Sequence, residues 1–91
     1  MASYPPSTAR LHAAVTSLMQ PDDGDRSEQS VRCQLLYRPT NSSYTLWVRS
    51  GLKESISVAL ASVLKRPFAV SDNHWVLDLN EAEALLTATS S

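Results

Sequence analysis

The chain has one cysteine and two histidines, residue types that often perform nucleophilic or metal chemistry, namely Cys33, His12 and His74. A cysteine nucleophile needs an imidazole beside the thiolate and a third group that orients the imidazole. Nothing in the spacing brings the three residues together, and Cys33 falls on the core face of a predicted strand, where a thiol is usually inert. One cysteine and two distant histidines also provide no spaced pair of zinc ligands. We therefore predict no catalytic residue and no metal site, and we expect that the protein is not an enzyme.

Two loops could bind other ligands. In segment 21–29 three aspartates surround a glycine, a combination that calcium loops use. The acids end at Glu28, however, and an EF-hand needs a carboxylate at its twelfth loop position, so the pattern predicts a solvated acidic loop. Segment 50–53 has a single glycine before a predicted helix, which favours helix capping over a phosphate cradle. We predict no cofactor.

Two predicted strands, 30–38 and 43–49, carry the most distinctive group of side chains. Both segments alternate, so each strand has one face toward a core and one face away from it. The outward face holds an unusual set of three arginines, a tryptophan and a leucine. The residues that we predict to bind a partner are Arg32, Leu36, Arg38, Trp47 and Arg49. Tryptophan and arginine dominate the energetics of protein interfaces, and arginines also steer acidic partners toward such a surface.

This face leaves three interpretations open. It could bind another protein, including a second copy of the chain. It could instead bind single-stranded RNA or DNA, because aromatic rings stack on bases and arginines contact phosphates. A third possibility is that another element covers Trp47 and that the arginines pair with acids elsewhere in the chain. We predict a non-enzymatic interaction module, such as a small adaptor, a chaperone-like factor or a regulator, with nucleic-acid binding as the alternative.

The charges are unevenly distributed although the formal net charge is only −1. Segment 30–71 holds six cations and one acid, whereas 1–29 has a net charge of −2 and 72–91 a net charge of −4. A basic centre between acidic ends can present a positive surface to an acidic partner, or its charges can neutralise each other on folding. The negative total and the absence of a binding motif rank nucleic acid below protein as the partner.

The elements that must position this surface follow from periodicity and capping signals. Helical spacing of apolar residues predicts helices at 9–20, 52–66 and 81–87, and alternation predicts strands at 30–38, 43–49, 68–70 and 74–79. The predicted N-caps are Ser7 or Thr8, Ser50 and Asn80, and Lys65 and Arg66 are predicted to close the second helix. The order predicts an α+β fold, helix–hairpin–helix–hairpin–helix, with an antiparallel sheet of about four strands and the helices packed on one face.

Length and composition predict a single domain over 1–91, with 1–6 and 88–91 flexible and 21–29 as the acidic loop. So small a domain often gains stability by pairing with a copy of itself, so we expect a homo-oligomer. A single cysteine fits a reducing compartment. No apolar run is long enough for a secretion signal or a membrane span. We therefore expect a cytoplasmic protein without a membrane partner.

Overall fold

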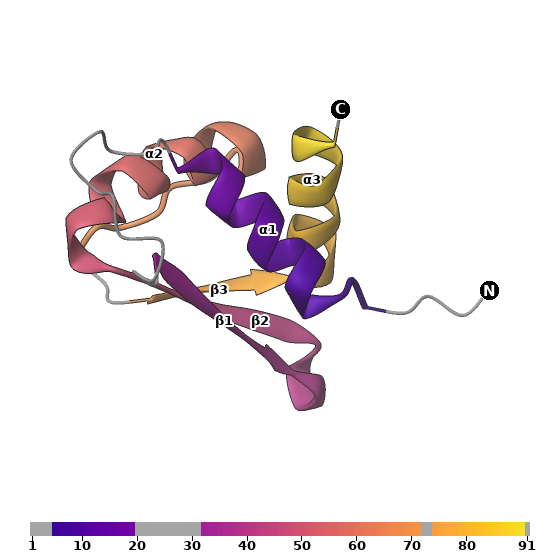
Figure 1. The fold of residues 1–91 in the computed structure, drawn as a ribbon. Helices are drawn as coiled ribbons and strands as arrows, with labels where there is room; N and C mark the ends of the chain where they lie inside the picture. Colours follow the sequence, from indigo (N-terminus) through magenta and orange to yellow (C-terminus); the bar gives the residue numbers. More distant parts are fainter. Residues whose placement is uncertain (1–4, 20–31, 72–73, 91) are drawn as a thin grey trace.

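The computed structural model describes residues 5–19, 32–71 and 74–90, so the predicted acidic loop 21–29 lies outside the described residues. The helices and strands are, in chain order, α1 (Thr8–Leu18), β1 (Cys33–Arg38), β2 (Ser43–Val48), α2 (Lys53–Leu64), β3 (His74–Asp78) and α3 (Leu79–Thr89). The strands form one antiparallel sheet in the order β1–β2–β3. The three helices lie on the same side of this sheet (Figure 1). The predicted α+β class is thus correct, but the described sheet has three strands instead of about four.

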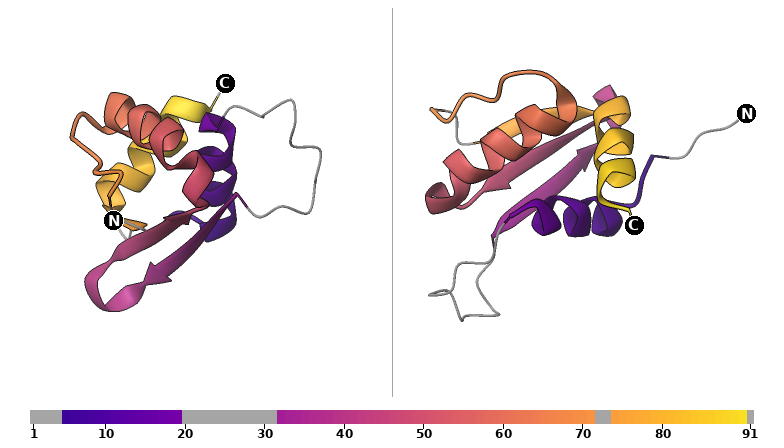
Figure 2. Two further views of the ribbon diagram at one scale, coloured as in Figure 1. Left: turned by 90° about the vertical axis from the view of Figure 1, so that its left-hand side faces the viewer. Right: turned by 90° about the horizontal axis from the view of Figure 1, so that it is seen from above.

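The alternation of β1 and β2 builds the core side of the sheet as predicted. On that side Tyr44 lies between Tyr37 and Leu77, and Leu46 lies between Leu35 and Trp75. The helices close this layer with fully buried side chains, which are Leu11, Val15, Ile56, Leu60, Ala82 and Leu85. Seen from above, α2 lies over the strands while α1 and α3 lie along the margin of the sheet, and the turn between β1 and β2 extends beyond the helices (Figures 1 and 2). The opposite side of the sheet is therefore left without a helix among the described residues.

The predicted strand at 68–70 is wrong, and the second hairpin does not form. The segment is irregular and β3 pairs with β2 instead. Side-chain contacts hold the segment in place: the buried Phe68 ring meets Trp75 edge-on at 5.9 Å between centroids, and Trp75 Nε1 donates a hydrogen bond to Ala69 O at 3.0 Å. An apolar run of three residues carries the same sequence pattern whether it pairs as a strand or packs as a loop.

Local capping decides where the first two helices begin. Ser7 caps α1, since its Oγ accepts a hydrogen bond from Arg10 N at 3.4 Å, and this confirms one of the two predicted caps. Ser50 does not cap α2, because it opens a 3₁₀ turn, Ser50–Leu52, in which Leu52 N donates to Arg49 O at 2.8 Å. The helix starts only after this turn.

The last helix is longer than predicted at both ends. Its N-cap is Asp78 and not Asn80, because Asp78 and Glu81 form a reciprocal capping box. Asp78 Oδ1 accepts from Glu81 N at 2.7 Å, and Glu81 Oε1 accepts from Asp78 N at 3.2 Å. The helix continues to Thr89, so residues 88 and 89, which we predicted as part of a flexible tail, are helical.

Candidate interaction surface on the open sheet face

The side of the sheet without a helix, here called the open face, consists of three cross-strand rows. One row joins Gln34, Trp47 and His74, the next joins Leu36, Thr45 and Val76, and the last joins Arg38, Ser43 and Asp78. Three of these residues are large apolar side chains with substantial exposure, namely Leu36 at 56 %, Trp47 at 40 % and Val76 at 52 %. Single exposed apolar residues are ordinary on protein surfaces, but three on one sheet face form a patch.

The middle row is a continuous surface and not two isolated side chains. Thr45 is only 4 % exposed although no described helix covers this side of the sheet. Its cross-strand neighbours Leu36 and Val76 flank it, and Arg38 Nε donates a hydrogen bond to Thr45 Oγ1 at 3.3 Å. Neighbouring side chains therefore close over Thr45, and Arg38 lies along the face beside the apolar row.

Trp47 is held in position by a ring contact. Its indole stacks on the imidazole of His74, with 4.4 Å between the ring centroids and 29° between the planes. The stacking fixes one side of the indole, and the exposed remainder stays accessible among the described residues. A pre-positioned aromatic side chain loses little rotamer freedom when a partner covers it, which favours binding.

Arg32 and Arg49 form the pair that follows Trp47 at one end of the open face. Arg49 N donates to Arg32 O at 3.0 Å, which continues the ladder between β1 and β2 by one more pair. A shallow pocket of about 270 Å³ lies at this end, lined by Arg32, Cys33, Gln34, Trp47, Val48 and Arg49. The structure thus brings all five of the predicted partner-binding residues to this face or to its end.

Sequence reasoning missed two residues of the open face, His74 and Val76. We predicted the strand at 74–79 as half of a second hairpin, which separated it from Trp47. The alternation of that segment already places His74 and Val76 opposite the buried Trp75, so a signal existed. The alternation gives the face on which these residues lie but not the neighbouring strand. The pairing of β3 with β2 joins residues that are far apart in the chain.

The structure also brings together His12 and Cys33, which the sequence kept apart. His12 Nε2 lies 3.0 Å from Cys33 O, so the ring contacts the backbone carbonyl and not the thiol. The thiol itself is buried 3.7 Å from Thr16 Oγ1, and burial raises its pKa above the ordinary cysteine value. A raised pKa disfavours the thiolate, and His12 contacts the backbone carbonyl, so the two residues do not form a thiolate with an adjacent base.

No group of three or more metal-ligating side chains occurs in residues 5–19, 32–71 and 74–90. Within the same ranges, no helix has the length and apolar character that crossing a membrane requires.

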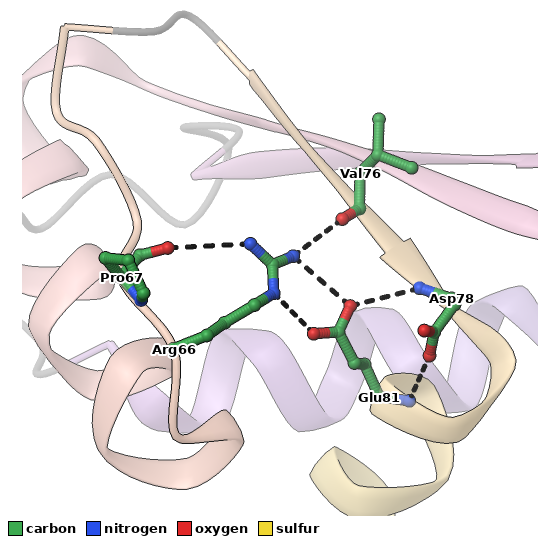
Figure 3. A network of polar contacts seen from close by, with 5 residues as sticks. All are labelled: Arg66, Pro67, Val76, Asp78 and Glu81. Carbon is green, nitrogen blue, oxygen red and sulfur yellow. Dashed lines mark hydrogen bonds and ion pairs between the residues drawn. The ribbon is translucent and has the colours of Figure 1, made fainter.

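Arg66 connects the basic centre of the chain to its acidic end. Instead of closing α2, which ends at Leu64, its guanidinium bonds Glu81 through Nε and Oε2 at 2.5 Å and through Nη2 and Oε1 at 3.2 Å (Figure 3). Its charge also lies 4.1 Å from the centre of the Phe68 ring. The hydrogen bonds from Arg66 are the main reason that the pKa of Glu81 is lowered. Part of the uneven charge is therefore neutralised on folding, at the β3 edge of the sheet, whereas Arg32 lies next to β1.

Comparison with known proteins gives no match: no family model, no curated protein and no solved structure corresponds to this chain. The geometry of the open face is therefore the basis on which a function can be argued.

Proposed function

We propose that this protein is a non-enzymatic interaction module that binds another protein through the open face. The observation that carries the proposal is the exposed apolar patch of Leu36, Trp47 and Val76 on a sheet face that no helix of the described residues covers. Interfaces of this kind centre on an aromatic anchor that is surrounded by polar and charged residues. The patch has that composition, with Trp47 as the anchor.

The arginines supply orientation and charge. Arg38 is held along the face by Thr45, and Arg32 and Arg49 lie at the end beside Trp47. Such a distribution favours a partner with an acidic surface, because complementary charges accelerate encounter and fix the orientation of docking. A small adaptor, a chaperone-like factor or a regulator of the cytoplasm would use a surface of this size and character.

A photo-crosslinking experiment tests the proposal and identifies the class of partner. A benzophenone amino acid in place of Val76 lies on the open face, and the same group in place of Val58, which is 71 % exposed on α2, is the matched control. Irradiation in cells is expected to give a discrete protein adduct at position 76 that the control does not give. An adduct at 76 that nuclease digestion removes would replace the proposal with nucleic-acid binding, and identical adducts at both positions would refute a specific face.

A further inference from the structure

The backbone hydrogen bonds of the sheet distinguish its two outer edges. The bond from Arg49 N to Arg32 O makes these two residues a hydrogen-bonded pair of the antiparallel ladder. Hydrogen-bonded and non-hydrogen-bonded pairs alternate along such a ladder. The N–H and C=O groups of Cys33, Leu35 and Tyr37 therefore point away from β2, toward the outer edge of β1.

The same alternation assigns the outer edge of β3. Residues 44 and 46 of β2 point their backbone groups at β3, so those of His74, Val76 and Asp78 point outward. Arg66 Nη2 donates to Val76 O at 2.9 Å, and Glu81 Oε1 accepts from Asp78 N at 3.2 Å (Figure 3). Side chains thus bond two of the outward backbone groups of β3, and we call this side of the sheet the closed edge.

The outer edge of β1 has a different status and is here called the open edge. His12 Nε2 lies 3.0 Å from Cys33 O at one end of it. No described hydrogen bond reaches the outward backbone groups of Leu35 and Tyr37. A strand edge with unpaired donors and acceptors is a template on which another strand can pair.

We propose that β1 pairs with β1 of a second copy of this chain, antiparallel and across a two-fold axis that passes through Leu36. Leu35 then exchanges backbone hydrogen bonds with the partner's Tyr37, and Tyr37 does the same with the partner's Leu35. The two three-stranded sheets become one continuous sheet. An interface of this type is self-complementary, as a two-fold dimer requires.

The ends of the strand select this register. Cys33 comes to lie opposite the partner's Pro39, which has no N–H to donate, and Cys33 O already has His12 as its donor. Moving the axis to Leu35 would place Arg32 opposite the partner's Arg38 and would make Tyr37 N compete with His12 for Cys33 O. Moving it to Tyr37 would place Leu35 opposite Pro39, which belongs to a 3₁₀ turn and not to the strand.

The side chains on the open face agree with the same register. Leu36 meets its own copy on the axis, so the rows of Leu36, Thr45 and Val76 from the two copies join end to end. Gln34 lies opposite the partner's Arg38, which avoids a pair of like charges. The pairing doubles the apolar row without covering Trp47, so it does not depend on what the open face binds.

Disulfide crosslinking tests the pairing directly. Leu36 forms a non-hydrogen-bonded pair with its copy, in which the Cα atoms are about 4.5 Å apart, and a disulfide spans roughly 4.4–6.8 Å. Leu36→Cys in a Cys33→Ala background is expected to form a covalent dimer under mild oxidation. Val76→Cys is the matched control, because it lies in the same row with 52 % exposure, against 56 % for Leu36, but at the closed edge. It is expected to remain uncrosslinked.

A charge exchange tests the register. Gln34→Arg places like charges opposite each other and is expected to weaken dimerisation at least about tenfold in sedimentation or light scattering. Adding Arg38→Glu restores an attractive pair and is expected to recover the dimer. A folded Leu36→Cys protein that stays uncrosslinked, or a Val76→Cys protein that crosslinks equally, would overturn the proposal. Neither readout involves an external partner, so their failure leaves the photo-crosslinking result at position 76 to be judged separately.

Discussion

The closed edge and the open edge belong to the same small sheet, yet in the described part of the chain side chains bond two outward backbone groups in the middle and at the end of β3, and only one group, at the end of β1. At the closed edge, Arg66 reaches across from the end of α2 and joins Val76 O to the capping box of α3. At the open edge, His12 contacts one carbonyl at the Cys33 end. An exposed edge invites association, and proteins usually protect it. This difference between the edges is the basis of the proposal that β1, and not β3, pairs with a second copy of the chain.

The largest loss of stability is expected from removing the side chain of Arg66, which bonds the closed edge to α3. Arg66→Ala removes the bonds to Glu81 and Val76 O together with the contact over Phe68, and leaves the partly buried Glu81 carboxylate with Asp78 N as its remaining donor. We expect the free energy of unfolding to fall by about 2 kcal/mol, measured by urea denaturation. Arg10→Ala on α1 is the control and should change it by less than about 0.5 kcal/mol. Equal losses in the two variants would show that the closed edge is not specially stabilised.

Acid should weaken the closed edge in the same way. Because the folded state lowers the pKa of Glu81, this group stabilises the protein above its unfolded pKa, which is about 4.3, and the contribution is lost as the pH falls through the folded pKa. Glu81→Gln should therefore be less stable than the wild type near pH 7 by about 1 kcal/mol, with the gap narrowing toward pH 3. Unfolding curves across this range measure the gap. A constant difference at every pH would contradict the assigned ion pair.

A smaller effect is expected at the open edge. His12→Ala removes one hydrogen bond to Cys33 O, a site that water or a second strand can also supply, so we expect a loss of about 0.5 kcal/mol. The variant also tests the register, because it leaves Cys33 O available to the partner's Tyr37. With His12 present, a single cysteine at position 36 should crosslink and one at position 35 should not. In the His12→Ala background, both single-cysteine variants should crosslink. If His12→Ala lowered the free energy of unfolding as much as Arg66→Ala does, the two edges would be equally stabilised by their side chains, contrary to the comparison.

Local periodicity accounts for the parts of this molecule that the sequence predicted well. The alternation of β1 and β2 assigns the described core residues of the hairpin to the correct side, and it also assigns Leu36, Arg38 and Trp47 to the open face; Val31, predicted for the core side, lies outside the described residues. Each of these assignments depends on neighbours within a few residues. The signal is local, so no knowledge of the rest of the fold is needed.

The parts that could not be predicted depend on contacts between distant segments. Trp75 donates to Ala69 O and so packs against segment 68–70, which lies outside the sheet, and the pairing of β3 with β2 brings His74 against Trp47. Arg66 illustrates the same limit: cations near a helix end usually act on its dipole, but here Glu81, fifteen residues along the chain, offers a better partner. Tertiary contacts of this kind override local preference.

The central claim is that the open face binds a protein, and calorimetric titration of the partner captured at position 76 tests it most directly. Trp47→Ala removes the anchor and is expected to weaken binding by about 2 kcal/mol, which is roughly thirtyfold. The dependence of the affinity on salt concentration should be nearly the same in the variant as in the wild type. Val58→Ala, on the helical side, should bind as tightly as the wild type. A folded Trp47→Ala protein with unchanged affinity would contradict the account.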